Sequence, residues 1–337
     1  MKVDIKLIYI LFQILLFGCV PNQRDTGMKT YTWLVTSCAP EDFPVEVMDG
    51  FFLLPDGRKM QIQIRSVVKN GWGKIGALIL SDEDKQALPL KMYIKWFSLR
   101  ERKFYQGMFD LESNDLEQAI AEKKISPVDG TEGAFKYFVV GTAPEGGVSL
   151  WLTGSGVCKE IGFFRADEIQ VDTTRFIGAS RSLEFYADAL LNNAFTEADN
   201  KNVRLGNYPL GKWSREYRKI FDWGFSFVSS PKGQSALISL FNGEVIFLPN
   251  TLEIEKFQNH PIPERIEINW LDKDGEENIL DIHFDESEIL TVFEHFAGYK
   301  SGIKVQIEFN SIDANTRIFV KNNEYVAELK KCVIQNF

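Results

Sequence analysis

The sequence predicts an α+β protein with two related domains of mainly antiparallel β-sheet, each carrying one or two helices. Three observations support this fold class. Stretches in which apolar and charged residues alternate outnumber stretches with helical periodicity. Turn residues such as Pro55-Asp56-Gly57 and Asp274-Gly275 lie between consecutive alternating stretches, as they do in β-hairpins. One alternating stretch also occurs twice in the chain.

Residues 1–18 are predicted to be a lipoprotein signal peptide. Two lysines precede an apolar run at residues 7–17, which is shorter than the about 20 residues of a membrane-spanning helix. The run ends at Gly18-Cys19, and a small residue before a cysteine at this place resembles the bacterial lipoprotein box, in which the cysteine is acylated. We therefore predict lipidation of Cys19. An ordinary leader, cleaved or retained, is the alternative, because Phe17 is larger than the residue usual in that box.

Residues 19–30 are predicted to form a flexible tether, because the stretch after Cys19 is short and polar. Val20 stands where an aspartate would resemble an inner-membrane retention signal. No acidic cluster that would resemble a surface-export signal follows. We therefore expect a cell-envelope protein that the lipid at Cys19 anchors in the outer membrane, with its body in the periplasm.

The composition predicts a folded body and disfavours a nucleic-acid partner. Hydrophobic residues make up 45% of the chain and charged residues 25%, which is ordinary for a globular protein. The net charge of −9 becomes about −10 once residues 1–18, with two lysines and one aspartate, are removed. Nucleic-acid binding requires a basic face, and no cluster of Lys and Arg is visible. The acidic balance favours a basic protein partner.

The first domain is predicted at residues 31–195. Its clearest strand is at residues 89–96, where Met92, Ile94 and Trp96 alternate with more polar residues and form one buried face. A glycine-rich turn at residues 71–76 leads into a strand at 75–80. Further strands are predicted at residues 104–111, 135–140, 148–152 and 160–164, and helices at residues 115–123 and 182–195.

A polar linker at residues 196–202 leads to a second, shorter domain at residues 203–337. Asp285 and Glu288 form a capping box at the start of a helix at residues 286–296. Further strands of this domain are predicted at residues 263–270, 279–284, 302–309 and 316–320.

The two domains are predicted to be tandem repeats. Pro89 and Trp96 recur as Pro263 and Trp270, both displaced by 174 residues, so the two tryptophans are expected at equivalent core positions. The same displacement aligns Gly50-Phe51 with Gly224-Phe225. Chance likeness between two amphipathic strands is the alternative.

Several short motifs follow one another in the first domain: Trp72-Gly73, Leu88-Pro89-Leu90, Trp96-Phe97-Ser98, Lys103-Phe104-Tyr105, Gly141-Thr142-Ala143-Pro144 with Gly146-Gly147, and Val148-Ser149-Leu150-Trp151-Leu152. Their order resembles the bacterial lipoprotein family known as domain of unknown function 2931, over residues 31–164. Glu145 is an extra acidic residue in the family's Ala-Pro-Gly-Gly turn. The resemblance implies an envelope lipoprotein and brings no catalytic residues. Some lipoproteins of this kind look like immunity proteins paired with secreted antibacterial toxins.

Histidine and serine motifs for catalysis are missing. His260, His283 and His295 form no HExxH pattern. We interpret His283 as a partner of the nearby helix cap and His295 as a cation at a helix C-terminus. Gly154-Ser155-Gly156 is interpreted as a hairpin turn, because it lacks the spacing of a nucleophile elbow.

The cysteines and the acidic residues likewise indicate no specific chemistry. Cys38, Cys158 and Cys332 can form one disulfide at most, and buried free thiols are favoured. The acidic loop at residues 272–277 is interpreted as a solvated hairpin and not as a calcium site. The sequence thus predicts no catalytic, cofactor-binding or metal-binding residues. A catalytic carboxylate pair is left open, because the separation of carboxylates depends on the fold.

Adjacent aromatic residues such as Trp96-Phe97 and Phe104-Tyr105 point to opposite faces of a strand. We favour sheets buried on both faces over exposed aromatic contact sites. The leading functional hypothesis is a non-enzymatic lipoprotein that binds a protein, and its sharpest form is immunity to an interbacterial toxin. The alternatives are a module that binds envelope carbohydrate or lipid and an enzyme with a carboxylate pair. An apolar groove between the domains would favour the carbohydrate- or lipid-binding module. Two close buried carboxylates in a cleft would favour the enzyme.

Overall fold

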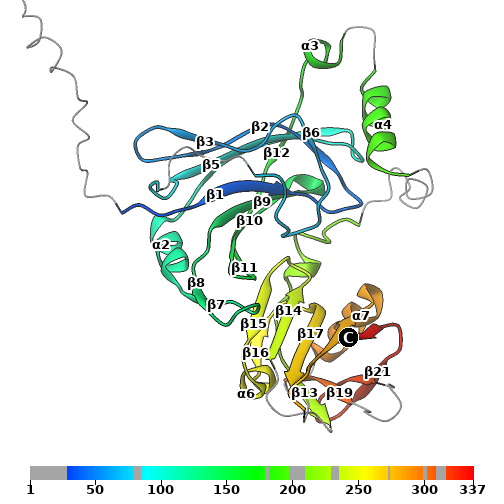
Figure 1. Cartoon of the computed structure of the whole chain (residues 1–337). Coiled ribbons are helices and arrows are strands. Elements are labelled where there is room, and N and C mark those ends of the chain that lie inside the picture. Colours follow the sequence, from blue (N-terminus) through cyan, green and yellow to red (C-terminus); the bar gives the residue numbers. More distant parts are fainter. Residues whose placement is uncertain are drawn as a thin grey trace, which may run out of the picture.

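The computed structural model describes residues 29–78, 85–178, 182–196, 209–228, 235–271, 274–298, 302–308 and 316–337 (Figure 1). The predicted signal peptide, Cys19, most of the tether at 19–30 and nearly all of the linker at 196–202 lie outside the described residues. Among the described residues, no helix is both long and apolar enough to cross a membrane. We call residues 29–196 the first half and residues 209–337 the second half.

Two sheets stack in the first half, shown in blue to green in Figure 1. One has the order β12-β6-β5-β2-β3, with β4 also paired to β2. Its strands are β2 (Val45–Leu53), β3 (Lys59–Gln61), β4 (Val67–Val68), β5 (Lys91–Ser98), β6 (Lys103–Asp110) and β12 (Asp167–Ile169). The other contains β1 (Leu34–Cys38), β9 (Tyr137–Ala143), β10 (Gly147–Gly154) and β11 (Val157–Arg165). A separate hairpin pairs β7 (Lys124–Ile125) with β8 (Glu132–Gly133).

The second half also has two layers of strands. One layer has the order β16-β13-β19-β20-β21. Its strands are β13 (Phe221–Val228), β16 (Gln258–His260), β19 (Ile303–Glu308), β20 (Arg317–Lys321) and β21 (Val326–Leu329). The other layer has the order β15-β14-β17-β18-β22. Its strands are β14 (Ser235–Leu240), β15 (Val245–Leu248), β17 (Pro263–Leu271), β18 (Glu277–His283) and β22 (Val333–Asn336).

One nine-stranded sheet runs through both halves, because β11 of the first half pairs with β15 of the second. The pairing consists of Cys158 opposite Val245. Pairing within the sheets is mainly antiparallel, but β1·β9 and β13·β19 are parallel. The structure is therefore rich in strands and poor in helices, in agreement with the predicted class of mainly antiparallel sheet with a few helices.

Both faces of the sheet around β5 are buried, which explains the adjacent aromatic residues. Trp96 stacks on Tyr105 at 5.3 Å between ring centroids and faces the core between the two sheets of the first half. Phe97 stacks on Phe104 at 4.6 Å on the opposite face. Residues of α4 cover that face. Burial on both faces is thus confirmed for these two pairs.

The helices are few and mostly short: α2 (Ser113–Ala121), α3 (Thr174–Ile177), α4 (Leu183–Ala194), α6 (Thr251–Glu255) and α7 (Glu286–Phe296), with single 3₁₀ turns η1 (Pro144–Gly146) and η2 (Glu216–Arg218). Asp285 caps α7 by accepting a hydrogen bond from the Glu288 amide at 2.9 Å. The reciprocal half of the predicted capping box does not form. The Glu288 carboxylate instead accepts hydrogen bonds from the amides of Lys330 and Lys331.

Three details differ from the sequence-based expectations. Residues 75–78 form no strand, and Ile75 is exposed. Gly50 lies in β2 beside β5, whereas Gly224 lies in β13, in a different sheet from β17, so this second alignment does not extend the first. Trp96 is fully buried, but Trp270 is only half-buried and packs at the margin of the second core, so the two tryptophans do not occupy equivalent core positions.

Candidate functional site

A buried polar cluster joins the two halves beside the β11·β15 pair. The Glu160 carboxylate is 8% exposed and forms an ion pair with Arg218 of the second half. It also accepts hydrogen bonds from the Ser149 hydroxyl at 2.7 Å and the Asn242 amide at 3.3 Å. The Glu160 backbone amide donates to Glu244 at 3.0 Å. Burial raises the pKa of Glu160, while Arg218 opposes the rise. Side chains of both halves are thus needed to complete this cluster.

The backbones of the two halves also touch. A Cβ atom added to Gly73 would lie 2.4 Å from the Gly243 carbonyl oxygen, so these glycines permit an approach that side chains would block. The Trp151 indole N–H donates to the Asn242 carbonyl at 3.2 Å. Cys158 lies beside the same contact, with its thiol 3.7 Å from the Gly73 carbonyl oxygen.

Glu145 forms a further contact between the halves. Its backbone has φ 62°, a left-handed conformation that is uncommon outside glycine. Its amide donates to Glu101 at 2.9 Å, and its carboxylate accepts from the Gly211 amide at 2.5 Å. The extra acidic residue of the Ala-Pro-Gly-Gly turn therefore fixes the start of the second half.

An acidic aromatic cleft of about 350 Å³ opens at the junction. Its aromatic lining residues are Phe43, Trp72, Trp213, Tyr217, Phe241 and Phe284, and its acidic lining residues are Glu41, Asp42, Glu264 and Glu286. The aromatic rings contact one another across the junction, with Phe43 and Trp213 centroids 5.1 Å apart. Glu41 and Asp42 are exposed. Lys74 and Lys212 line the cleft too, so four carboxylates against two ammonium groups combine with the aromatic walls to give excess negative charge.

Lys212 shows how the cleft holds a cation. Its ammonium group lies 2.7 Å from the Glu286 carboxylate and 5.2 Å from the centre of the Tyr217 ring. Burial and the neighbouring Glu286 raise the pKa of Tyr217, so this phenol stays neutral. Desolvation by the cleft walls raises the pKa of Glu264, and Lys74 opposes that rise. Carboxylate and aromatic groups thus act on the same cation.

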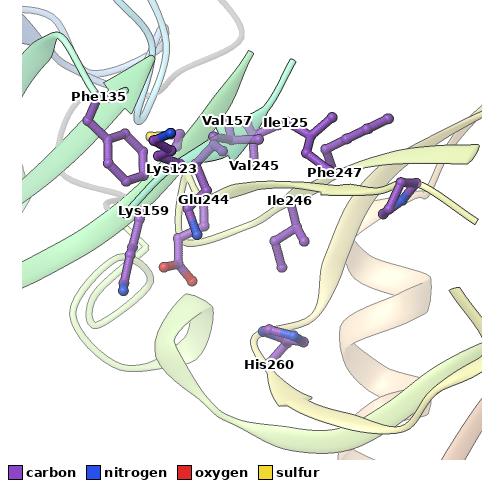
Figure 2. Close-up of a pocket in the computed structure, with 13 residues that line it drawn as sticks. Lys123, Ile125, Phe135, Val157, Lys159, Glu244, Val245, Ile246, Phe247 and His260 are labelled. Carbon is purple, nitrogen blue, oxygen red and sulfur yellow. The ribbon is translucent and has the colours of Figure 1, made fainter. Parts of the chain in front are cut away.

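An apolar cavity of about 370 Å³ lies between the β7–β8 hairpin and β15 (Figure 2). Its apolar lining residues are Ile125, Phe135, Val157, Val245, Ile246, Phe247 and Pro249. Its polar and charged lining residues are Lys123, Lys124, Lys159, Glu244 and His260. Figure 2 shows Lys159 and Glu244 towards the left of the view, and Ile246 above His260 near its centre. Burial lowers the pKa of His260.

The histidines lie apart from one another. His260 lines the apolar cavity, and His283 lines the acidic aromatic cleft. His283 contacts Asp281 at 3.2 Å and not the helix cap at Asp285, because it is the last residue of β18 and faces the neighbouring carboxylate of its own strand. His295 lies in the last turn of α7, as expected.

The three thiols are free: Cys38 and Cys158 are buried, and Cys332 is partly buried. Burial raises the pKa of Cys38 to about 12 and that of Cys332 to about 12. In the part of the chain that the structure describes, no three His, Cys, Asp or Glu side chains gather to hold a metal ion.

Sequence reasoning missed the junction itself. The Asn242-Gly243-Glu244 turn between β14 and β15 carries the hairpin signal Asn-Gly, which was available in the sequence. The hydrogen bond between Glu160 and Glu244 of this turn could not be read from the sequence. The two residues are 84 positions apart, and no local pattern links them. The lysines of the apolar cavity likewise come from distant segments: Lys123 and Lys124 from the start of the β7–β8 hairpin, and Lys159 from β11.

Comparison with known proteins gives one match. The family model described as Protein of unknown function (DUF2931) matches residues 20–211, which is more than half of the chain and ends before β13. No curated protein and no solved structure matches the chain. By the extent of the family match, the chain belongs to the family Protein of unknown function (DUF2931).

Proposed function

We propose that this protein is a non-enzymatic outer-membrane lipoprotein, anchored through Cys19, whose periplasmic body binds a basic protein. The observation that carries the proposal is the acidic aromatic cleft. A site with excess carboxylates and aromatic walls suits an inserted arginine or lysine of a partner. The net charge of −9 would also steer a basic partner towards this surface.

Immunity to an interbacterial toxin is the sharpest form of this proposal. Exposed Glu41 and Asp42 would meet a basic rim, and the aromatic walls would enclose one large side chain of the toxin. Binding of this kind depends on a few central residues, with the surrounding contacts excluding water. Family membership supports the proposal by analogy alone.

The test is affinity capture with the full chain from producing cells and their close competitors, followed by mass spectrometry. Recovery of one toxin-like protein at equal stoichiometry is expected. The double variant Glu41→Lys/Asp42→Lys should weaken its binding at least about tenfold, which corresponds to about 1.4 kcal/mol. The variant Glu112→Lys/Asp115→Lys changes the charge equally at exposed positions outside the cleft and should bind normally. Equal loss in both variants, or no recovered protein, would contradict the proposal.

We also propose that the two halves are tandem repeats. In the first half, β5 lies between β2 and β6, and β12 pairs with β6. In the second half, β17 lies between β14 and β18, and β22 pairs with β18. Each half also pairs its first strand in parallel with a later strand, β1 with β9 and β13 with β19, and a helix precedes that later strand in both halves, with the β7–β8 hairpin inserted in the first. These matching connections support the repeat more strongly than the displacement of 174 residues does.

A second function, binding of an envelope carbohydrate or lipid, is favoured by the apolar cavity. Its lining is mainly apolar with a few charged groups, which is typical of sites for small molecules. Retention of lipid or glycan on the captured protein, without a protein partner, would support this function over the first.

A further inference from the structure

We propose that the apolar cavity binds the single acyl chain of a fatty-acid anion, with the carboxylate held by Lys124 and Lys159. This inference rests on the second function proposed above and specifies its ligand. The cavity volume of about 370 Å³ lies in the lower part of the range of small-molecule sites. One chain suits such a volume better than the paired chains of a phospholipid does.

The cavity wall supplies the apolar contacts. Val157 is buried, while Val245, Ile246 and Phe247 of β15 are half-buried and Ile125 is 44% exposed. Ile125 and the three β15 side chains thus keep apolar surface in contact with water, and an acyl chain in the cavity would cover it. Phe135 forms another part of the wall and lies in the core of the first half, which gives the cavity a fixed boundary.

The charged groups favour an anionic head. Lys124 and Lys159 share the Glu122 carboxylate, at 2.8 and 3.3 Å. The cavity lining itself carries three lysines, Lys123, Lys124 and Lys159, against one carboxylate, Glu244, so cationic groups outnumber acidic ones there. Lys159 is 47% exposed and Glu122 43%, so their ion pair contributes little and a ligand carboxylate can replace it. Lys124 also lies 5.9 Å from the centre of the Phe135 ring, beside the apolar wall.

The end of the described chain places the proposed anchor near this cavity. Lys29 forms an ion pair with Glu117 of α2 at 2.9 Å. Glu117 lies in α2, which ends at Ala121, two residues before the cavity-lining Lys123. Ten residues separate Cys19 from Lys29, and a chain of that length spans at most about 36 Å when fully extended. A lipid anchor at Cys19 would therefore hold the cavity close to the membrane, where acyl chains are abundant.

The experiment uses the full chain in its own membranes and a dodecanoate with a terminal diazirine as the probe. After illumination, mass spectrometry should locate the label on Ile246, Phe247 or Phe135. Excess dodecanoate should compete, and uncharged dodecanol should compete much less. Lys159→Glu should lower labelling about fivefold, because it replaces an attraction with a repulsion.

Lys103→Glu is the matched control. Lys103 is 46% exposed and pairs with Glu168 at 2.7 Å, and it does not line the cavity, so this variant should label normally. Label scattered over the surface, equal competition by dodecanol, or no effect of Lys159→Glu would overturn the inference. Membrane fractionation of the Cys19→Ala variant tests the anchor separately. If fractionation shows that Cys19 does not anchor the protein, labelling of the released protein with the dodecanoate probe still tests whether the cavity binds an acyl chain.

Discussion

Glu160 accepts hydrogen bonds from side chains of both halves while its carboxylate stays nearly inaccessible to water. A buried carboxylate of this kind gives little net stability through charge alone, since its desolvation offsets much of the attraction to Arg218. Removal of the Glu160 carboxylate, by contrast, should lower stability. Arg218 and Asn242 would then keep their half-buried or buried polar groups without this acceptor.

Glu160→Ala is therefore expected to lower the free energy of unfolding by about 2 to 4 kcal/mol. Denaturation with guanidinium chloride, followed by tryptophan fluorescence, measures the change. Glu168→Ala is the control, because its ion pair with Lys103 is exposed and should contribute at most about 1 kcal/mol. Equal losses in the two variants would show that the polar cluster does not stabilise the junction.

His260 predicts a pH dependence of stability. Burial lowers the pKa of His260 below the value of 6.5 that an exposed histidine has, so the folded state binds the proton less readily than the unfolded chain. Unfolding then takes up a proton, and the free energy of unfolding should decrease as the pH falls below 6.5 through the lowered pKa.

The measurement is denaturant unfolding between about pH 7 and pH 5 for the wild type and His260→Gln. The variant should lose less stability over this interval. His295→Gln replaces an exposed histidine in the same way and serves as the control. A wild-type slope that His260→Gln leaves unchanged would contradict the assignment.

At the scale of elements, two hairpin turns with glycine offer a direct comparison. Gly243 in the β14–β15 turn has φ 87°, and Gly275 in the β17–β18 turn has φ 83°. A Cβ atom at Gly243 would lie 3.0 Å from Gly73 and 3.1 Å from Trp151, whereas one at Gly275 meets nothing within 4 Å. The backbone strain of a side chain is thus similar at both turns, but crowding occurs only at the junction.

Gly243→Ala should consequently cost about 1 to 2 kcal/mol more free energy of unfolding than Gly275→Ala, which carries the backbone strain of about 1 kcal/mol alone. Urea denaturation of both variants measures the difference. If the two variants are equally stable, the contact between Gly73 and Gly243 is looser than the structure indicates.

For the whole molecule, the shared nine-stranded sheet predicts coupled unfolding. The β11·β15 pair, the Glu160 cluster and the contact of Phe43 with Trp213 all link the halves. Tryptophan fluorescence and far-ultraviolet circular dichroism should therefore give one coincident transition in guanidinium chloride. The variant Gly73→Val forces a side chain against Gly243 and should therefore split this single unfolding transition into two. Two separate transitions in the wild type would refute the coupling.

Much of the local fold followed from local patterns. Alternation predicted the strands around Trp96 and Ile266, and the apolar stripe after Asp285 predicted α7 with its observed bounds. Such predictions succeed because periodicity and capping act between neighbours in the chain. The strand expected at residues 75–80 did not form at 75–78, where the backbone of Gly76 instead bonds to the Thr36 hydroxyl.

The candidate site, by contrast, was visible only in part. Sequence alone determined the class of mainly antiparallel sheet with few helices, the acidic balance and the family of the first half. It also singled out Glu145, but not the amide of Gly211 that this residue binds. Only the tertiary structure decided that Glu160 meets Arg218, Asn242 and Glu244, and that β7 and β15 enclose one cavity. The reason is that contacts between distant segments depend on how sheets pair and pack, and residue spacing does not encode that arrangement.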